Sequence, residues 1–385
     1  MEDWQNGGFG LYIHWPFCES KCPYCDFNSH VAAIINQKDW QTAYLSEIDR
    51  LGKETAGRRL DTVFFGGGTP SLMDPALVGA IIERIRTTWT MRNDPEITLE
   101  ANPGSIEAGR FFGFKDAGIT RISMGMQAMN DEDLRLLGRK HTAKEGRDAF
   151  EIARGCFDRV SFDLIYARQN QDISHWEQEL TAALDLAVDH LSLYQLTIED
   201  GTAFADRLAR GGLKGLPNDD LSADMYAKTQ SVTERAGMGA YEISNHARNG
   251  AESLHNLIYW RGGDYIGIGP GAHGRLTHQS IRWATEAPKS PSFWLKMVQA
   301  GKVGELPRVS LTAKDHALEY LMMSLRLTEG MSIPRYNSIA PLPLSQDRLD
   351  YLTDLEMIVA DDSTVTATPS GRIVLNAIIR ELAEG

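Results

Sequence analysis

Near its start the chain reads His14-Trp15-Pro16-Phe17-Cys18-Glu19-Ser20-Lys21-Cys22-Pro23-Tyr24-Cys25-Asp26-Phe27. Three of its four cysteines fall in this stretch, with the spacing CxxxCxxC. Thiolates held this closely on one loop can surround a metal centre. A tetrahedral zinc would need a fourth protein ligand, whereas a four-iron, four-sulfur cluster keeps one iron open for a small molecule. We therefore predict a cluster bound by Cys18, Cys22 and Cys25.

A structural zinc site completed by His14 or His30 is the alternative for the same cysteines. The sequence contains no second CxxC pair and no HxxxH pair to supply the usual partner ligands. The fourth cysteine, Cys156, lies far downstream in a helical, half-apolar stretch. We expect it to be a buried core thiol, because four cysteines in 385 residues do not make a disulfide framework.

Short β-branched or aromatic runs alternate with helical periodicity in the first half of the chain. The expected strands are residues 11–15, 62–65, 96–100, 121–126, 160–165 and 190–196. This alternation predicts a parallel sheet with helices outside, as a barrel or as an open doubly wound sheet. Polar residues at or just beyond strand ends favour the barrel, where those ends share one face: the cysteine loop, the 66–70 turn, Glu100, Gln127 and Asp163.

The later part of the chain predicts a second, smaller unit. We expect a barrel with an extension over residues 1–287, a connector carrying one short helix over 288–309, and a C-terminal domain over 310–385. Helices are predicted in the extension at 219–236 and in the C-terminal domain at 312–327, 345–355 and 371–382, with a short hairpin strand at 365–368. This order is typical of a winged-helix-like module that packs against the barrel or gates it.

Charge and hydropathy exclude several partner classes. Acidic residues outnumber basic ones by 52 to 39, so we expect no nucleic-acid partner, which would need a concentrated positive surface. No stretch approaches the length of a membrane-spanning helix, and the first residues lack the pattern of a secretory signal. Free thiols and an oxygen-sensitive cluster then predict a cytoplasmic location.

The cysteine spacing, with Tyr24 just before the last cysteine, resembles that of the radical S-adenosylmethionine (SAM) superfamily. The segments YIHWPFC (12–18) and GGGTP (66–70) are similar to those of the oxygen-independent coproporphyrinogen III oxidase family. Within it, KCPYCDF (21–27) looks like the heme chaperone branch called HemW. The resemblance covers nearly the whole chain. It implies an α/β fold, a partial (βα)6 TIM-like barrel, with a smaller, mainly helical C-terminal domain.

The resemblance also implies a set of cofactor-binding residues. In the superfamily the open iron is chelated by SAM, which one-electron reduction cleaves to a 5′-deoxyadenosyl radical. Glycines after a strand let backbone groups approach a ligand closely, and charges at strand ends would pair with cofactor groups. Matching this chain to the family's motifs assigns SAM contacts to Tyr12, Tyr24, Gly67, Gly68, Thr69, Glu100, Gln127, Arg139 and Asp163. No residue is assigned a catalytic role.

Two departures separate this chain from the oxidase branch. That branch has a further cysteine two positions after the last cluster cysteine, where this chain has Phe27, and a longer arm before the cluster. In contrast, His255-Asn256-Leu257-Ile258-Tyr259-Trp260 matches the HNxxYW segment of the chaperone branch, which implies heme binding by His255. A hydrogen-bonded histidine beside two core aromatics is the alternative, and His246 and His273 are secondary ligand candidates.

Together these features predict a heme chaperone that binds a [4Fe-4S] cluster, SAM and heme, and delivers heme to acceptor proteins. Its expected partners are heme-dependent acceptor proteins and an electron donor protein, with membrane contact only peripherally through acceptors. Two alternatives stay open: an oxygen-independent coproporphyrinogen III oxidase, and a radical SAM enzyme acting on an unrelated substrate. Whether the chain is an enzyme is not decided, although the chaperone reading favours a non-enzymatic role.

Overall fold

Parallel strands form the centre of the molecule, for which a computed structural model describes residues 2–32, 34–104 and 108–384. In this part of the chain neighbouring strands run parallel in the order β10 (Asp264–Ile268), β1 (Phe9–Trp15), β4 (Arg59–Gly67), β5 (Thr90–Ala101), β6 (Arg121–Gln127), β7 (Arg159–Tyr166) and β8 (His190–Gln195). From β1 onward they follow one another in chain order. A doubly wound sheet reverses its order in the middle. The barrel is therefore confirmed, with all six predicted strands, and the doubly wound alternative is wrong.

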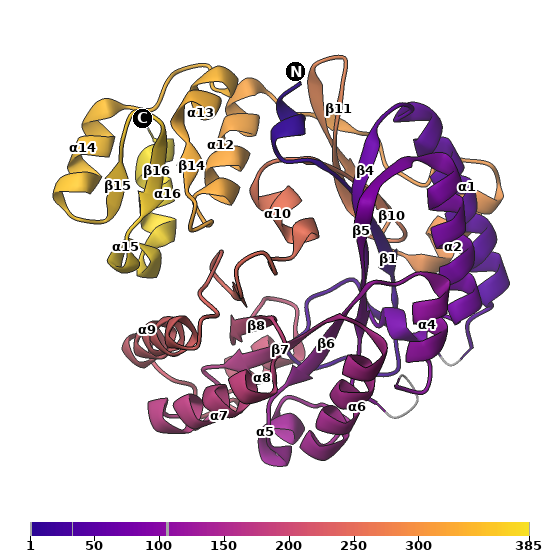
Figure 1. Cartoon of the computed structure of the whole chain (residues 1–385), viewed down its shortest axis with the longest axis horizontal. Coiled ribbons are helices and arrows are strands. Elements are labelled where there is room, and N and C mark those ends of the chain that lie inside the picture. Colours follow the sequence, from indigo (N-terminus) through magenta and orange to yellow (C-terminus); the bar gives the residue numbers. More distant parts are fainter. Residues whose placement is uncertain (1, 33, 105–107, 385) are drawn as a thin grey trace.

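The connecting helices cover the outer face of this curved sheet (Figure 1). They are α1 (Gln37–Glu54), α2 (Pro75–Thr88), α4 (Phe111–Ala117), α6 (Ala143–Cys156) and α7 (Ile173–Leu186), with α9 (Asp219–Arg235) packed on α7. Side-chain caps explain where several of them begin. Asn36 and Asp74 accept backbone hydrogen bonds at the starts of α1 and α2, and a capping box between Thr142 and Glu145 starts α6.

Side chains alternate between the two faces of each central strand. On β1 the buried Leu11, Ile13 and Trp15 face the helices, where Trp15 packs edge-on against Trp40 at 5.8 Å between ring centroids. Residues of the other parity point into the barrel, and on β5 to β8 these are largely polar. Because strand side chains alternate with period two, one face builds the core while the other is left for a site.

Antiparallel strands extend the sheet at both edges. They are β11 (His273–His278), β12 (Ile281–Glu286) and β13 (Val309–Ser310) beyond β10, and β9 (Asn245–Ala247) beyond β8. Strands β10 to β12 were not predicted from the sequence. In the connector, α11 (Pro291–Gln299) packs on α1, and Trp294 stacks on Trp40 at 5.6 Å between ring centroids. This stretch thus contributes to the barrel core.

A second core lies in the C-terminal part, within residues 320–382. It is built by α12 (Ala313–Ser324), α13 (Ile333–Ile339), α14 (Gln346–Asp354), α15 (Pro369–Ile373) and α16 (Leu375–Ala383), with a sheet of β14 (Met331–Ser332), β16 (Thr364–Ala367) and β15 (Ile358–Ala360). The predicted closing helix is two helices, α15 and α16, and α13 was not predicted. The unit is mainly helical, as expected.

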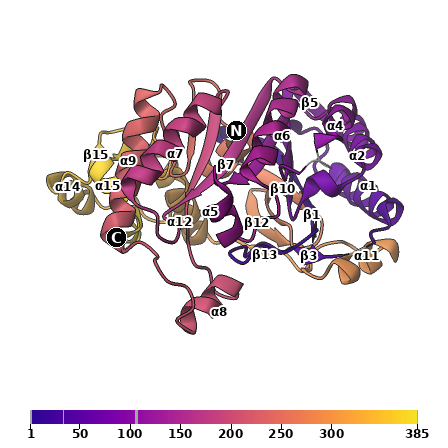
Figure 2. The same ribbon diagram turned by 90° about the horizontal axis from the view of Figure 1, so that it is seen from below.

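The C-terminal unit and the barrel meet at α10 (Leu254–Trp260) (Figure 1). Ion pairs join them: Asp3 with Arg335 at 2.7 Å, and Arg275 with Glu319 at 2.8 Å. At another edge, α8 (Ala203–Ala209) projects from the barrel (Figure 2), and the backbone N–H of Phe204 donates to the carbonyl of Pro23 in the cysteine loop. No helix within the described ranges is long and apolar enough to cross a bilayer.

Candidate functional site

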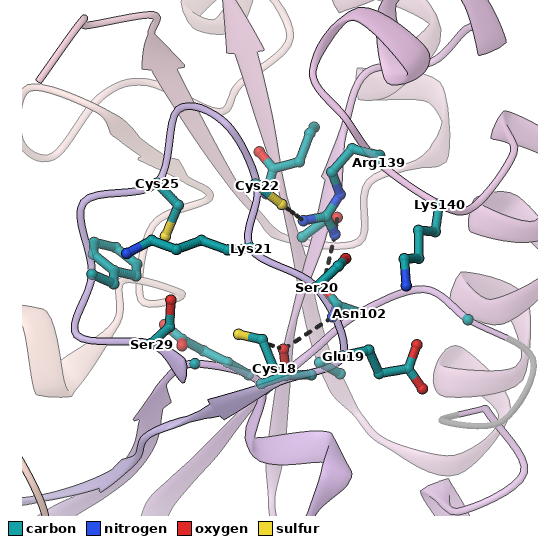
Figure 3. A pocket seen from close by; sticks show the side chains of 18 of the residues that line it. Cys18, Glu19, Ser20, Lys21, Cys22, Cys25, Ser29, Asn102, Arg139 and Lys140 are labelled. Carbon is teal, nitrogen blue, oxygen red and sulfur yellow. Dashed lines mark hydrogen bonds between the residues drawn. The ribbon is translucent and has the colours of Figure 1, made fainter. Parts of the chain in front are cut away.

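The three cysteines lie on the loop between β1 and α1. The loop is anchored at its start, where Phe17 and Cys18 form β2 and pair with β3 (His30–Val31). The backbone N–H of Thr69 also donates to the Phe17 carbonyl at 2.8 Å. All four cysteines are free thiols. Figure 3 shows the sulfurs of Cys18, Cys22 and Cys25 at three separate positions around this loop.

One pocket of about 310 Å³ gathers most of the residues that the sequence singled out. It lies at the carboxyl ends of the parallel strands, as the barrel prediction required. Its lining includes Cys18, Cys22, Cys25, Tyr24, Gly67, Gly68, Thr69, Glu100, Gln127, Arg139 and Asp163. Tyr12 lies in a neighbouring cavity, and His255 and His246 line neither. The structure brings these residues together in one pocket, whereas the role of each in ligand binding stays a prediction.

Hydrogen-bond donors approach two of the sulfurs. The hydroxyl of Thr69 donates to Cys18 Sγ at 3.3 Å, and the Arg139 guanidinium donates to Cys22 Sγ at 3.3 Å. Asn102 connects the two donors: its amide donates to Thr69 Oγ1 at 3.1 Å, and its Oδ1 accepts from Arg139 at 2.7 Å (Figure 3). Sequence reasoning gave Asn102 no role, although its position just after β5, beside Glu100, was the available signal.

The donor set fits an iron–sulfur cluster better than a single zinc ion. Among the described residues, no three histidine, cysteine or acidic side chains converge on one point as a mononuclear metal requires. Thiolates spread around a loop suit a cluster, because each binds a different iron. Burial raises the pKa of the Cys18 and Cys25 thiols in the metal-free protein, so metal binding must supply the free energy for their deprotonation.

Two glycines let the backbone of the 66–70 turn pass close to the loop. Gly67 has φ of 111°, a conformation that residues with a Cβ rarely adopt. A Cβ on Gly68 would lie 2.6 Å from the Phe17 carbonyl oxygen. The Gly67 N–H is directed at a Glu100 carboxylate oxygen 3.2 Å away. The sequence-predicted role of this turn as a close-approach site is consistent with this geometry.

Two carboxyl groups, Glu100 on β5 and Asp163 on β7, face the same pocket on either side of β6. Burial in the pocket wall and the nearby Asp163 raise the pKa of Glu100 to about 8, against a partial opposing effect of the Gly67 N–H. Burial also raises the pKa of Asp163 to about 6, although Ser192 and Arg121 favour its charged form. The pair therefore favours a ligand that brings a positive group or hydroxyl donors.

Replacing Glu100 by glutamine is expected to remove part of the pH dependence of stability. The folded protein holds a proton on Glu100 up to about pH 8, whereas the unfolded chain loses it near the ordinary glutamate pKa of 4.5. The free energy of unfolding therefore falls as pH rises through this window. Because the group is half-buried and partly screened, we expect Glu100→Gln to recover about 2 kcal/mol at pH 8.5 and little at pH 5.

Urea unfolding of the cofactor-free protein from pH 5 to pH 9 measures this effect. The matched control is Glu83→Gln on the exposed face of α2, which should leave the profile of the native protein unchanged. Parallel pH profiles for Glu100→Gln and the native protein would contradict the raised pKa.

A second cavity of about 810 Å³ adjoins the cysteine pocket. The two share lining residues from the cysteine loop and from the ends of β4 and β5: Lys21, Phe27, Ser29, Gly67 and Glu100. Of these, Phe27 has 57% of its surface exposed. The remaining lining comes from β1, the end of the cysteine loop with β3, α10, the stretch from β10 to β11, Lys289 in the connector and Met323 on α12. The second cavity thus lies between the barrel and the C-terminal unit.

His255 does not reach this cavity. It is fully buried in the barrel, stacked on Phe64 at 5.2 Å between ring centroids. Its Nδ1 hydrogen-bonds with the hydroxyl of Thr62 at 2.7 Å and its Nε2 with the hydroxyl of Tyr259 at 2.6 Å. Burial lowers its pKa to about 3, so the ring stays neutral. Both ring nitrogens are in use, and binding iron through His255 would require Tyr259 to move. Its heme-ligand role stays a prediction that this geometry does not favour.

Comparisons with known proteins agree with this site. A family model described as the radical SAM superfamily matches residues 12–182. The chain is 38% identical to radical S-adenosyl methionine domain-containing protein 1, mitochondrial, of Bos taurus, over 97% of this chain and 86% of that protein. It is 37% identical to heme chaperone HemW of Escherichia coli strain K12, over 96% of each.

A solved structure shows the same fold. Coproporphyrinogen III oxidase (HemN) from Escherichia coli, described as a radical SAM enzyme, aligns with a TM-score of 0.80 over 98% of this chain and 90% of that one, at 23% identity. At this identity the likeness concerns the fold alone. The similarity to HemW extends over nearly the whole chain, and the cysteine pocket lies at the barrel mouth; together they decide the family. The chain belongs to the radical SAM superfamily and, within it, to the HemW branch of the oxygen-independent coproporphyrinogen III oxidase-like family.

Proposed function

We propose that the protein is a heme chaperone that binds a [4Fe-4S] cluster and SAM in the barrel and delivers heme to heme-dependent acceptor proteins. The observation that carries this proposal is the three-cysteine pocket in a chain that aligns along nearly its full length with proteins named heme chaperone HemW. The second cavity beside that pocket offers space for a ligand much larger than a single amino acid.

Within this proposal, Cys18, Cys22 and Cys25 hold the cluster, which supplies one-electron chemistry and an open iron when bound. Thr69 and Arg139 donate hydrogen bonds to the sulfurs of Cys18 and Cys22 and thereby orient them. Glu100 and Asp163 accept hydrogen bonds from amino or hydroxyl groups of SAM, and Tyr24 borders the ligand. The backbone of Gly67 and Gly68 allows close approach, and Gln127 adds a neutral donor and acceptor.

A coproporphyrinogen III oxidase is the second candidate, because a protein of that activity shares the fold. Phe27 at the position of the oxidase branch's further cysteine argues against it. The test is anaerobic incubation of reconstituted protein with SAM, a reductant, and either coproporphyrinogen III or heme. We expect stoichiometric heme uptake and no decarboxylated product. Formation of protoporphyrinogen would instead establish the oxidase.

The partners follow from the same proposal. A heme carrier needs an acceptor apoprotein, and a reducible cluster needs an electron donor protein. A reducing compartment such as the cytoplasm suits free thiols, although some relatives are named as mitochondrial. Transfer of bound heme to an apoprotein that lacks it, followed by absorption spectroscopy after separation, would test delivery.

A further inference from the structure

The second cavity has the walls that a flat macrocycle needs. Aromatic side chains line it from β1, α10 and β10, namely Tyr12, Tyr259, Trp260 and Tyr265. Met323 on α12 adds a flexible apolar contact from the C-terminal unit. Large aromatic surfaces gain both apolar burial and stacking against such residues. The volume of about 810 Å³ is within the range for cofactor-sized ligands.

The charges around this cavity suit a ligand that carries carboxylates. Lys21 comes from the cysteine loop and Lys289 from the start of the connector. The acidic residues of the same lining are Asp26 and Glu100, and Glu100 is the carboxyl group whose raised pKa keeps much of it neutral at pH 7. Ammonium groups on separate segments can pair with separate carboxylates, as on a porphyrin with two propionates.

Three histidines line the cavity, and they differ in whether a ring nitrogen is free. His14 uses both: Nδ1 bonds with the Tyr12 hydroxyl at 3.1 Å and Nε2 with the Asn28 carbonyl at 3.0 Å. His30 uses Nε2 with the Asn28 side chain at 3.1 Å. The ring of His273, at the start of β11, has no hydrogen-bond partner among the described residues, and the Oε1 atom of Glu286 lies 3.9 Å from its Nε2.

His273 is accessible, with 57% of its side chain exposed, whereas His14 is buried. It is held on a strand, because β11 pairs with β12 through the register of His273 with Glu286. An imidazole with an unbonded nitrogen on a fixed strand is a suitable axial ligand for heme iron. His255, in contrast, is behind Tyr259 with both nitrogens bonded.

We propose that the second cavity is the heme-binding site, that His273 supplies an axial ligand to the iron, and that Lys21 and Lys289 pair with the propionates. This inference rests on the proposed function. In it, His273 donates a lone pair to the iron, and no bond is broken. His255 is a positioning residue that fixes the hydroxyl of Tyr259 in the cavity wall.

The experiment is titration of the full chain, with its cluster reconstituted, with ferric heme and separately with iron-free protoporphyrin. His273→Ala should weaken heme binding about tenfold and shift the Soret band, while binding of the iron-free porphyrin stays unchanged. His255→Ala should weaken binding of both porphyrins without shifting the Soret band of bound heme. Circular dichroism checks that each variant is folded.

The propionate contacts are tested by a charge reversal. Lys289→Glu should weaken binding of both porphyrins about fivefold without a Soret shift, since ion pairs of this kind contribute about 1 kcal/mol. Lys296→Glu, the same change on the exposed side of α11, is the matched control and should have no effect.

The outcomes separate this site assignment from the proposed function. If the native protein binds no heme, the proposed function fails. The native protein could instead bind heme while His273→Ala retains the native affinity and Soret band and His255→Ala alters the band. The proposed function would then stand, and the assignment of this heme-binding site would be wrong. Weakened heme binding and a shifted band in His273→Ala alone would establish His273 as the ligand.

Discussion

Replacing Cys22 by alanine is expected to abolish cluster binding. Its sulfur is one of only three on the loop, and the guanidinium of Arg139 donates a hydrogen bond to it. With two thiolates left, a second iron would lose its protein ligand, and the Arg139 charge would lose the sulfur it pairs with. We expect the absorption of the reconstituted cluster near 400 nm, and with it bound iron and sulfide, to fall to background, a loss of about tenfold or more.

Cys156→Ala is the matched control for the loss of one thiol. Cys156 is half-buried at the end of α6, packed against the barrel core, where a fully buried thiol was expected. Its removal should leave iron and sulfide content unchanged. A Cys22→Ala protein that held a full complement of iron and sulfide would contradict the cluster assignment, and a spectrum without cluster in the native protein after reconstitution would do so directly.

Replacing the buried Asp264 by alanine is expected to lower the free energy of unfolding strongly. Asp264 is fully buried on β10 and pairs with Arg58 at 2.8 Å and with Arg282 at 2.9 Å. It also accepts hydrogen bonds from the backbone and hydroxyl of Thr277. Alanine leaves two largely buried guanidinium groups without their carboxylate, which costs about 3–5 kcal/mol.

Urea unfolding followed by tryptophan fluorescence measures this loss. The control is Asp148→Ala, which removes an exposed ion pair with Lys144 and should change the free energy of unfolding by less than about 1 kcal/mol. An Asp264→Ala protein as stable as the control would show that Arg58 and Arg282 find other partners. Because Asp264 joins β10 to β11 and β12, the same variant should also loosen the wall that carries His273.

Strands and the location of the site could be predicted from the sequence where a local pattern is compatible with one structure only. Alternation along 11–15 and 96–100 located strands, since only one face of each is apolar. Polar residues such as Glu100 and Asp163 at strand ends indicated the mouth of the barrel, because parallel strands end on one face. The cysteine spacing then located the site, and the 66–70 turn lies beside it as expected.

Other features depended on contacts that the sequence does not display. The sequence assigned no structure to the glycine-rich segment 267–274, which contains the end of β10, a turn at 269–272 and the start of β11. A Cβ on Gly267 would lie 2.1 Å from the carbonyl oxygen of His273, so glycine here permits two strands to approach. Tyr12 was expected beside SAM but stacks on Phe64 at 6.2 Å and faces the other cavity.

The contacts of His255 also could not be predicted from its sequence motif. The spacing of the HNxxYW segment places His255 and Tyr259 on one helix face, where they hydrogen-bond through Nε2. The segment does not indicate that the hydroxyl of Thr62 hydrogen-bonds to the other ring nitrogen, Nδ1. That contact joins residues 193 positions apart in the chain. A sequence motif can therefore name a histidine without indicating which of its nitrogens is free.

The cysteine loop forms one wall of both cavities, through Lys21, Phe27 and Ser29. Asn28 extends the same loop, donating hydrogen bonds to the carbonyls of Pro270 and Lys289 at the far rim. If ligands in the two cavities affect one another's affinity through this shared wall, thermodynamic linkage requires the effect to be equal in both directions. A bound cluster that raises the affinity for a porphyrin by some factor would then have its own affinity raised by the same factor when the porphyrin binds. Loss of the cluster would correspondingly weaken porphyrin binding.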